Sequence, residues 1–414
     1  MLFLPKSLYS FAIIISISLT AIGQPSGFFH TKGKDIIAPD GKAFLIKGTN
    51  LGNWLVPEGY MFKLGDVSSP RLINKVITEL IGPREAFNFW KKFLDNYIIQ
   101  DDIHYLKSIG VNSIRLPFNY RLFSKEYYMG VSDSLHGFVY MDRLINWCKK
   151  ENIYILLDMH CAPGGQTGDN IDDGYGFPFL FDNEADIEQT ASIWKSIAAR
   201  YKNEKIIMGY DLLNEPIAHY YDSNHFNPLL EPVYKKIVKA IREVDKNHTI
   251  YLGGAQWNSN FKPFGKPFDD NMVYTFHKYW TPPTKAVIQD YIDFREKYNV
   301  PIYVGETGEN TDGWVDSFRV VCEQNNVGWH FWPYKKMEST RGFASFAQPA
   351  GYDSVINYAG KPRTTFSDLR AARPKSMDDI RKSLDLLLQN IKFKNCMANE
   401  GYIKALGLNF KKIE

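Results

Sequence analysis

Two glutamates, Glu215 and Glu306, each stand at the end of a short apolar run of the kind that forms a buried strand. Glu215 comes after Ile207–Leu213 and Asn214, and Glu306 comes after Ile302–Gly305. Two carboxylates that meet around one sugar ring can cleave a glycosidic bond, because one protonates the leaving oxygen and the other acts from the opposite face. A single glutamate at a strand end also serves as a helix cap or an ion-pair partner, so the hypothesis depends on the residues that accompany the pair.

Polar residues at other strand ends fit this chemistry. We expect Arg115 to hold Glu306 ionised as a nucleophile through a charge-assisted hydrogen bond. Tyr279 can donate a hydrogen bond to the same carboxylate. Asn214 is suited to bind the 2-hydroxyl of the sugar, an interaction that strengthens in the transition state. These residue types therefore indicate a glycosidase site rather than a structural ion pair.

Aromatic residues are frequent, with 28 Phe, 25 Tyr and 9 Trp making up 15% of the chain. Most of these rings must pack in a core, but such a composition also suits a cleft in which sugar rings stack on aromatic faces. We expect Trp332, at the end of a predicted strand, to stack beneath the reacting sugar. His160 and His277, also at strand ends, are expected to bond sugar hydroxyls or to hold the carboxylates in place.

The chain alternates short apolar runs with longer amphipathic stretches. The runs expected to form strands are Ala43–Gly48, Ser113–Leu116, Tyr154–Met159, Ile207–Leu213, Thr249–Leu252, Met272–Phe276, Ile302–Gly305 and Gly328–Trp332. The stretches expected to form helices are Pro83–Ile109, Val139–Lys150, Glu184–Arg200, Glu231–Asp245, Lys285–Lys297 and Trp314–Asn325. This alternation favours parallel strands joined by right-handed crossovers, and we predict a single (β/α)8 TIM barrel with extended βα loops. An open doubly wound sheet is less favoured, because Gly48–Gly52 lacks the glycine pattern of a phosphate-binding turn.

The ends of the predicted barrel carry additional segments. Asp35–Lys42, which contains a Pro-Asp-Gly turn, is expected to form a small N-terminal hairpin that closes one end. The connection Gly253–Asn271 is expected to be mostly loop. A last helix is expected at Met377–Ile391, and the tail after Lys361 is interpreted as a closing helix with a C-terminal cover.

Residues 1–23 have the pattern of a secretory signal peptide, with Lys6, the apolar stretch Phe11–Ile22 and small residues at the cleavage site. Residues 24–414 would then form an exported catalytic domain, located in the periplasm, at the cell surface or outside the cell. No run reaches the ~18 apolar residues of a membrane span. The net charge of +3 without a basic stripe argues against nucleic acid as a partner. We expect a monomer without a cofactor.

Other reaction classes lack their required patterns. A metal-dependent hydrolase would need clustered ligands, but no His-x-His pair occurs, and neither His160 nor His277 has an obvious set of carboxylates. No metal is therefore expected. A serine hydrolase is disfavoured because the Gly-x-Ser-x-Gly elbow is missing. Four cysteines match no zinc spacing and are expected to be buried thiols, although export would permit a disulfide: Cys148, Cys161, Cys322 and Cys396.

Several of these motifs together resemble the signature of glycoside hydrolase family 5, a family of retaining barrel enzymes. They are Arg115–Pro117, Leu213–Pro216, His277 with Tyr279, Gly305–Glu306 and Phe331–Trp332. The resemblance extends from about Gly48 to Trp332, and Leu-Asn-Glu-Pro is its most specific part. It implies that Glu215 is the general acid/base and Glu306 the nucleophile.

Within that family, the sequence is most similar to the exo-β-1,3-glucanases. The similar segments are Gly48–Glu58, His160–Gln166, Asp169 with Asn170, and Phe331–Lys335. In that group, the residues matching Glu58 and Asp169 bind hydroxyls of the terminal glucose, and Asn170 is counted with them as substrate-binding. The resemblance implies a secreted retaining enzyme that attacks laminarin-type β-1,3-glucan from its non-reducing end. Gly168 departs from the pattern, because the group carries an aromatic residue there.

Two alternatives remain open from the sequence. The same scaffold could serve an endo-β-glucanase acting on cellulose, mixed-linkage glucan or β-1,6-glucan. A more remote alternative is a non-catalytic sugar-binding barrel. That alternative predicts the loss of a carboxylate or of Arg115, whereas Glu215, Glu306 and Arg115 are all present.

Overall fold

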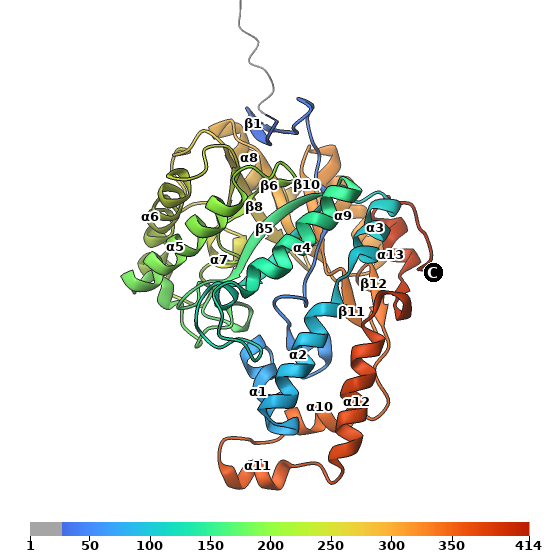
Figure 1. Cartoon of the computed structure of the whole chain (residues 1–414). Helices are drawn as coiled ribbons and strands as arrows, with labels where there is room; N and C mark the ends of the chain where they lie inside the picture. The colour runs from blue at the N-terminus through green and yellow to red at the C-terminus, as the bar shows by residue number, and fades with distance from the viewer. Residues whose placement is uncertain (1–26, 414) are drawn as a thin grey trace, which may run out of the picture.

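The computed structural model describes residues 27–413, so the predicted signal peptide at residues 1–23 lies outside the described chain. Eight parallel strands close into a barrel in the order β10-β3-β4-β5-β6-β7-β8-β9 (Figure 1). They are β3 (Lys47–Asn50), β4 (Ser113–Asn119), β5 (Tyr154–Cys161), β6 (Ile207–Asp211), β7 (Thr249–Gly253), β8 (Met272–Lys278), β9 (Ile302–Gly308) and β10 (Gly328–Trp332). The predicted (β/α)8 TIM barrel is confirmed.

A small hairpin closes the amino-terminal end of the barrel, as predicted, but it spans residues 30–37, whereas the predicted segment Asp35–Lys42 ends in an isolated bridge between Ile37 and Ala43. It pairs β1 (His30–Lys32) with β2 (Asp35–Ile37), and the expected Pro-Asp-Gly turn follows β2. Phe29 and Ile36 are buried at the bottom of the barrel. They belong to one apolar cluster with the inward-facing residues Leu156, Met208, Tyr251, Val273 and Tyr303. The hairpin therefore seals the end of the barrel opposite the predicted site.

The first barrel strand begins later than predicted. Ala43 forms a bridge with Ile37, and the Phe44 amide donates to the Ile36 carbonyl at 2.8 Å. These residues continue the hairpin, so the parallel ladder starts at Lys47 instead of Ala43. A β-rich run alone does not reveal where a chain changes its pairing partner.

Helices join the strands on the outside of the barrel. They are α1 (Pro70–Ile81), α2 (Pro83–Tyr97), α3 (Gln100–Ile109), α4 (His136–Glu151), α5 (Glu184–Tyr201), α6 (Ser223–Arg242), α8 (Gln289–Tyr298) and α9 (Asp312–Gln324). The element α7 (Ala255–Asn258) is a short turn after β7, with positive φ values at Gln256, Trp257 and Asn258, and is not an outer α-helix. Short 3-10 helices lie in the loops: η1 (Gly59–Phe62), η2 (Tyr120–Phe123), η3 (Asn170–Asp172), η4 (Phe179–Phe181), η5 (Lys285–Ile288) and η6 (Phe393–Asn395). No helix among residues 27–413 combines the length and the apolar character that crossing a membrane requires.

Two helix predictions need correction. The predicted helix Pro83–Ile109 is two helices, because Ile98 and Ile99 are extended and the Asp102 carboxylate accepts the Ile99 amide at 2.8 Å, which starts α3. The predicted helix Glu231–Asp245 begins earlier, at Ser223. Its sequence contains Pro228 and Pro232, and proline inside a helix normally indicates a break. The connection between β7 and β8 is mostly loop, as predicted.

The C-terminal segment forms a cover beside the barrel. It contains β11 (Lys335–Met337), β12 (Ala344–Phe346), β13 (Met397–Ala398), α10 (Asp353–Ala359), α11 (Phe366–Ala372), α12 (Met377–Asn390) and α13 (Glu400–Ala405). The helix expected at Met377–Ile391 is present and packs on α1 and α2. The short α13 contacts α9, and the Asn409 amide that follows it bonds the Ile109 carbonyl of α3 at 2.9 Å. Helix α13 thus takes the place of the eighth barrel helix.

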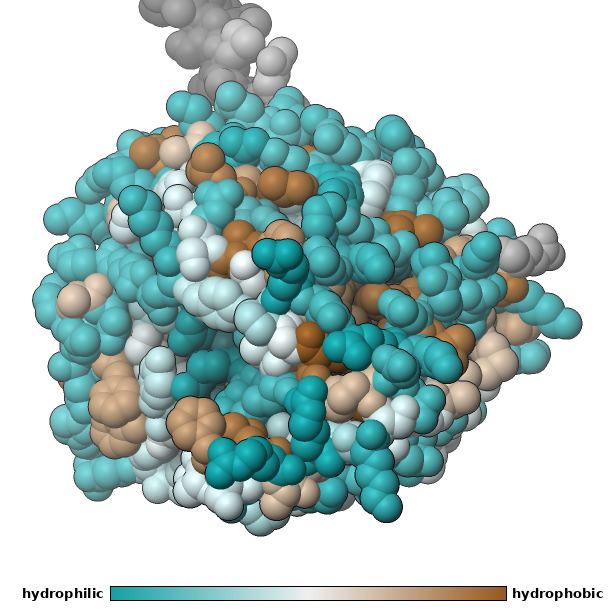
Figure 2. Space-filling model, turned by 60° about the horizontal axis from the view of Figure 1, so that its bottom comes forward, coloured by the Kyte–Doolittle hydropathy of each residue, from teal (hydrophilic) through white to brown (hydrophobic). Residues whose placement is uncertain are grey.

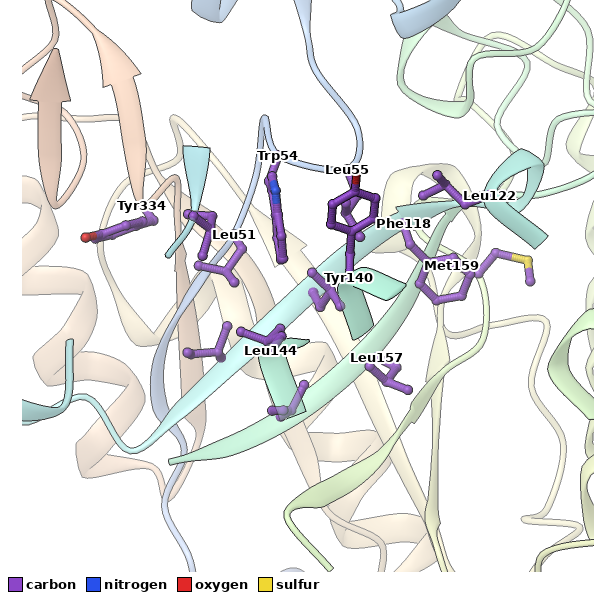
Figure 3. Close-up of a cluster of buried hydrophobic side chains, with 14 of the residues drawn as sticks. Leu51, Trp54, Leu55, Phe118, Leu122, Tyr140, Leu144, Leu157, Met159 and Tyr334 are labelled. Carbon is purple, nitrogen blue, oxygen red and sulfur yellow. The ribbon is translucent and has the colours of Figure 1, made fainter. Parts of the chain in front are cut away.

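The main core lies between the barrel and its outer helices. Figure 3 shows part of it, where Trp54 and Leu55 of the β3 loop meet side chains of β4, β5 and α4. The Trp54 indole donates to the Leu94 carbonyl at 2.9 Å, so even this polar atom is satisfied. All four cysteines are buried free thiols, as predicted.

A buried ion pair attaches the cover to the barrel. Lys335 Nζ pairs with Asp102, and both side chains are 0% exposed. Lys335→Met is expected to lower the free energy of unfolding by about 3–5 kcal/mol, because it leaves a buried carboxylate without its cation. Urea unfolding would measure this loss. The exposed pair of Lys404 and Glu400 supplies the control, since Lys404→Met should cost less than about 1 kcal/mol. Equal losses of unfolding free energy in Lys335→Met and Lys404→Met would show that the buried pair does not anchor the cover.

Candidate active site

The surface is hollowed into a pocket of ≈ 740 Å³ at the carboxyl ends of the barrel strands (Figure 2). A pocket of this size suits a small ligand such as a short oligosaccharide. Most of the predicted site residues line it: Glu58, His160, Asp169, Asn170, Glu215, His277, Tyr279, Glu306 and Trp332. Arg115 and Asn214 lie behind this wall, where both are buried. The structure therefore brings the predicted residues together from separate strands and loops.

Arg115 on β4 is the centre of a buried hydrogen-bond network. Its Nη1 donates to Glu306 Oε1 at 2.5 Å, and its Nη2 donates to Asn214 Oδ1 at 2.9 Å. Tyr279 Oη donates to Glu306 Oε2 at 3.2 Å. Both contacts that the sequence predicts for Glu306 are present. They hold its carboxylate between a cation and a phenol, which fixes its orientation toward the pocket.

Two buried carboxyl groups below Arg115 were missed by the sequence analysis as site residues. Arg115 Nε donates to Asp211 Oδ2 at 2.8 Å, and its Nη2 lies 3.0 Å from Asp158 Oδ1. Burial raises the pKa of each aspartate to about 7, against the lowering effect of Arg115. Asp158 Oδ2 also lies 2.8 Å from His160 Nδ1. Because alternate residues of a strand share a face, the Asp-x-His spacing was an available signal.

Glu215 follows β6 with a backbone φ of 46°, a left-handed conformation that glutamate rarely adopts. His277 Nδ1 lies 2.8 Å from Glu215 Oε1. Burial lowers the pKa of His277 to about 3, so this ring is neutral. Burial also raises the pKa of Glu215 to about 7, although His160 and Arg115 act in the opposite direction. A carboxyl group with that pKa can hold and return a proton near neutral pH.

The two glutamates lie close together. A carboxylate oxygen of Glu215 and one of Glu306 are within 4.8 Å of each other. Retaining glycosidases place their carboxyl groups ~5–5.5 Å apart, whereas inverting enzymes need ~6.5–9.5 Å to admit a water molecule. The separation of Glu215 and Glu306 corresponds to the retaining arrangement.

Two groups of side chains in the described part of the chain have the geometry of possible metal ligands. They are Asp158 with His160 and Glu306, and Glu215 with His277 and Glu306. The sequence argument that neither histidine has carboxylates nearby is therefore wrong. Glu306, which both groups share, already bonds Arg115 at 2.5 Å. A fixed positive charge at that distance disfavours a second cation on the same carboxylate, so the absence of a metal stays a prediction.

Two further carboxyl groups face the pocket. Glu58 is 5% exposed, and no described residue donates a hydrogen bond to its carboxyl group. Burial, with a further contribution from Glu306, raises the pKa of Glu58 well above its usual value. Asp169 accepts from Tyr220 Oη at 2.8 Å and from the Asn170 amide at 2.6 Å. Their positions leave both groups accessible to hydroxyls of a ligand.

One end of the pocket is formed by a linked set of side chains. The Trp332 ring stacks parallel to His160, with 5.7 Å between ring centroids, and its Nε1 donates to Tyr60 Oη at 2.7 Å. Tyr60 in turn donates to Glu309 Oε2 at 3.1 Å, and Lys336 Nζ bonds Glu309 Oε1 at 2.5 Å. Tyr60, Glu309 and Lys336 were missed from the sequence because all three lie beyond the predicted barrel strands: Tyr60 in η1, Glu309 after β9 and Lys336 in β11.

The rim of the pocket opposite Trp332 explains why Gly168 stands where the exo-β-1,3-glucanases carry an aromatic residue. A Cβ atom at this position would lie 2.5 Å from the Tyr221 ring, and Gly168 also has a φ of +76°. Tyr221 Oη donates to the Gly168 carbonyl at 2.9 Å. Trp257 and Trp280, which also line the pocket, were not predicted; Trp280 is 73% exposed. Aromatic residues of other loops thus occupy this side of the pocket.

Comparisons with known proteins agree with this geometry. The sequence profile described as Cellulase (glycosyl hydrolase family 5) matches residues 79–342. The chain belongs to glycosyl hydrolase family 5. It is therefore a glycoside hydrolase, and the resemblance predicted from the sequence motifs is confirmed.

Family 5 relatives of the chain carry several activities in their names. A beta-xylosidase of Phanerodontia chrysosporium is 31% identical over 404 residues, which cover 88% of this chain and 83% of that protein. Endoglucanase C of Acetivibrio thermocellus is 28% identical over 60% of this chain and 88% of its own length. A glucan 1,3-beta-glucosidase of Candida oleophila is 27% identical over 56% of this chain, and the match spans 55% of that enzyme. These three names describe three different activities, so membership of the family does not by itself fix the substrate linkage.

Solved structures show the same fold. An endogalactoceramidase structure superposes with a TM-score of 0.57 at 18% identity, and the match covers 75% of each chain. The rutinosidase from Aspergillus niger gives a TM-score of 0.56 at 19% identity, covering 71% of this chain and 90% of that chain. At this level of identity the likeness concerns the barrel fold alone.

Proposed function

We propose that this family 5 enzyme is a retaining exo-β-glucanase that releases glucose from the non-reducing end of β-1,3-glucan. The observation that carries the proposal is the pair of carboxyl groups within 4.8 Å of each other in the pocket. Glu306, held by Arg115 and Tyr279, is suited to nucleophilic attack. Glu215, with its raised pKa, is suited to proton transfer.

The reaction proceeds in two displacements. Glu306 attacks the anomeric carbon while Glu215 gives its proton to the leaving glycosidic oxygen, which forms a glycosyl ester on Glu306. Glu215, now ionised, then takes a proton from a water molecule that attacks the same carbon. The ester breaks, Glu306 is again a carboxylate, and the sugar is released with its original anomeric configuration.

The exo action and the linkage rest on finer features. Glu58 and Asp169 offer carboxyl groups to hydroxyls in the pocket, and hydrogen bonds of this kind would fix a terminal sugar. The similarity to a glucan 1,3-beta-glucosidase supports the β-1,3 linkage. The relative named beta-xylosidase matches over more of this chain, so a terminal β-xylose is the second candidate.

We also propose that the enzyme acts outside the cytoplasm as a monomer. The charged start, apolar stretch and small residues of positions 1–23 support export. Measuring the mass of the mature N-terminus after expression in the native host would test cleavage before Gln24.

A product profile tests the proposed activity. The enzyme should be incubated with laminarin, cellulose, mixed-linkage glucan, β-1,6-glucan and xylo-oligosaccharides, and the products separated. Glucose as the sole early product from laminarin is the expected outcome. A ladder of oligosaccharides would instead show endo action in an open cleft, and release of xylose alone would favour the second candidate.

The pH dependence follows from Glu215. Its carboxyl group must be protonated when the leaving oxygen departs, so kcat/KM on oligosaccharides should fall as the pH rises through about 7. A 2,4-dinitrophenyl glycoside needs no proton on its leaving group, and its kcat/KM should fall much less over the same range. If kcat/KM fell equally for both substrates as the pH rises through about 7, the acid role of Glu215 would be contradicted.

A further inference from the structure

Three consecutive residues after β7 have a left-handed backbone. Gln256, Trp257 and Asn258 have φ values of 49°, 56° and 56°. Such conformations are costly for residues other than glycine and persist where the surrounding structure requires them, often at functional sites. Trp257 lines the pocket, whereas Asn258 is fully buried beneath it. Asn258 is therefore held in this conformation although its side chain does not line the pocket.

The Asn258 side chain has one hydrogen-bonding role in the described chain. Its Nδ2 lies 3.0 Å from His277 Nε2, and its Oδ1 is buried without a partner among the described residues. Gly253 makes room for this amide, because a Cβ atom there would lie 2.2 Å from Asn258 Oδ1. The buried side chain is thus directed at His277 by the backbone around it.

The contact determines which nitrogen of His277 carries hydrogen. An amide Nδ2 group can only donate, so His277 Nε2 accepts and is unprotonated. The neutral ring then has its hydrogen on Nδ1, which donates to Glu215 Oε1 at 2.8 Å. An oxygen that already accepts this bond is the poorer site for a proton, so the acidic proton of Glu215 resides on Oε2.

We propose that Asn258 is a positioning residue that sets the tautomer of His277 and thereby directs the acidic proton of Glu215 onto Oε2, the oxygen that His277 leaves free. The inference rests on the proposed acid/base role of Glu215 and adds the residue that prepares it. Asn258 does not touch the pocket, so its effect passes entirely through His277. Comparable outer hydrogen bonds fix the tautomers of functional histidines in other enzymes.

Asn258→Asp provides the test, because it keeps the shape of the side chain and replaces the donor by an acceptor. His277 Nε2 must then carry hydrogen, and the ring, placed between the introduced carboxylate and Glu215, becomes a cation that holds Glu215 ionised. We expect kcat/KM on laminari-oligosaccharides to fall roughly 100-fold, since general acid catalysis contributes on this scale. With the 2,4-dinitrophenyl β-glucoside, kcat/KM should change less than about threefold.

Controls separate this role from a structural one. Asn260→Asp makes the same substitution in the same loop, where Asn260 Nδ2 donates to Gln256 Oε1. It should leave unchanged the ratio of kcat/KM on laminari-oligosaccharides to kcat/KM on the 2,4-dinitrophenyl β-glucoside. Asn258→Gly suits the φ of 56° and deletes the amide, so it should lower the same ratio even if Asn258→Asp folds poorly. Thermal unfolding should accompany each assay.

The outcomes are distinct. Equal losses on both substrates, or no loss on either, would overturn the role of Asn258. If the wild-type enzyme hydrolyses neither substrate, the proposed β-glucanase activity fails instead. If Glu215→Ala shows no dependence on the leaving group while Asn258→Asp does, the acid assignment fails and the influence of Asn258 on His277 must act elsewhere.

Discussion

Glu306→Gln is expected to reduce kcat on β-glucosides by roughly 10⁴-fold or more, the scale on which enzymes lose activity when a nucleophile is removed. The amide cannot form the glycosyl ester, because it has no free carboxylate oxygen to attack with. The substitution is nearly isosteric, so Tyr279 keeps a partner and the fold should be retained. Steady-state kinetics on a 2,4-dinitrophenyl β-glucoside measures the loss even when proton transfer is not limiting.

The matched control for this variant is Glu400→Gln on α13, where the side chain is exposed and pairs with Lys404 at the surface. It should keep wild-type kinetics. An activity of Glu306→Gln within about tenfold of the wild type would remove Glu306 from the nucleophile role, given the scale above. Loss of the folded state in circular dichroism would instead show that Arg115 depends on this carboxylate for its position.

Glu215→Ala should separate the two chemical steps. We expect kcat/KM on laminari-oligosaccharides to fall about 10²–10⁴-fold, because a sugar leaving group needs the proton that Glu215 supplies. A 2,4-dinitrophenyl β-glucoside should still form the glycosyl ester on Glu306. Hydrolysis of that ester is then slow, since no base remains to activate water, and a burst of dinitrophenolate should precede slow turnover.

Azide gives this variant a second readout. As an anionic nucleophile it needs no general base, and it can enter the space left by the removed carboxyl group. We expect azide to accelerate turnover of Glu215→Ala and to yield the β-configured glucosyl azide. An unaffected rate in a folded variant, or an α-configured azide, would contradict the acid/base assignment.

The strand ends could be predicted well because the barrel imposes a simple relation between sequence and space. A polar residue that ends an apolar run lies on the carboxyl rim, so Arg115, Glu215 and Glu306 converge although they are far apart in the chain. The same relation, applied to the residue two positions before His160, would have found Asp158, because alternate residues of β5 share a face.

Loop residues could not be found in this way. Trp257 and Trp280 reach the pocket through left-handed backbone conformations, with φ values of 56° and 53°, and no periodic pattern predicts these for tryptophan. Tyr60 contributes through contacts with Trp332 and Glu309, which lie more than 240 positions away in the sequence. Such contacts depend on the packing of whole loops.

The helix that occupies the last barrel position could not be predicted from the sequence either. The amphipathic pattern of Met377–Ile391 is clear, and α12 forms there, but it covers α1 and α2. The barrel position between α9 and α3 is taken by α13, a helix of six residues. A helix this short has too few residues to show a periodic pattern, so its role follows only from the packed structure.

Trapping the reaction intermediate with a 2-deoxy-2-fluoro-β-glucosyl fluoride tests whether Glu306 and Glu215 act together on one anomeric carbon. The fluorine at position 2 slows both steps, whereas the fluoride leaves readily, so the glycosyl ester accumulates. Peptide mass spectrometry after proteolysis should find the sugar on Glu306, and Glu306→Gln should remain unmodified. An adduct on another residue, or wild-type hydrolysis that proton NMR shows to release the α-anomer first, would contradict the assignment.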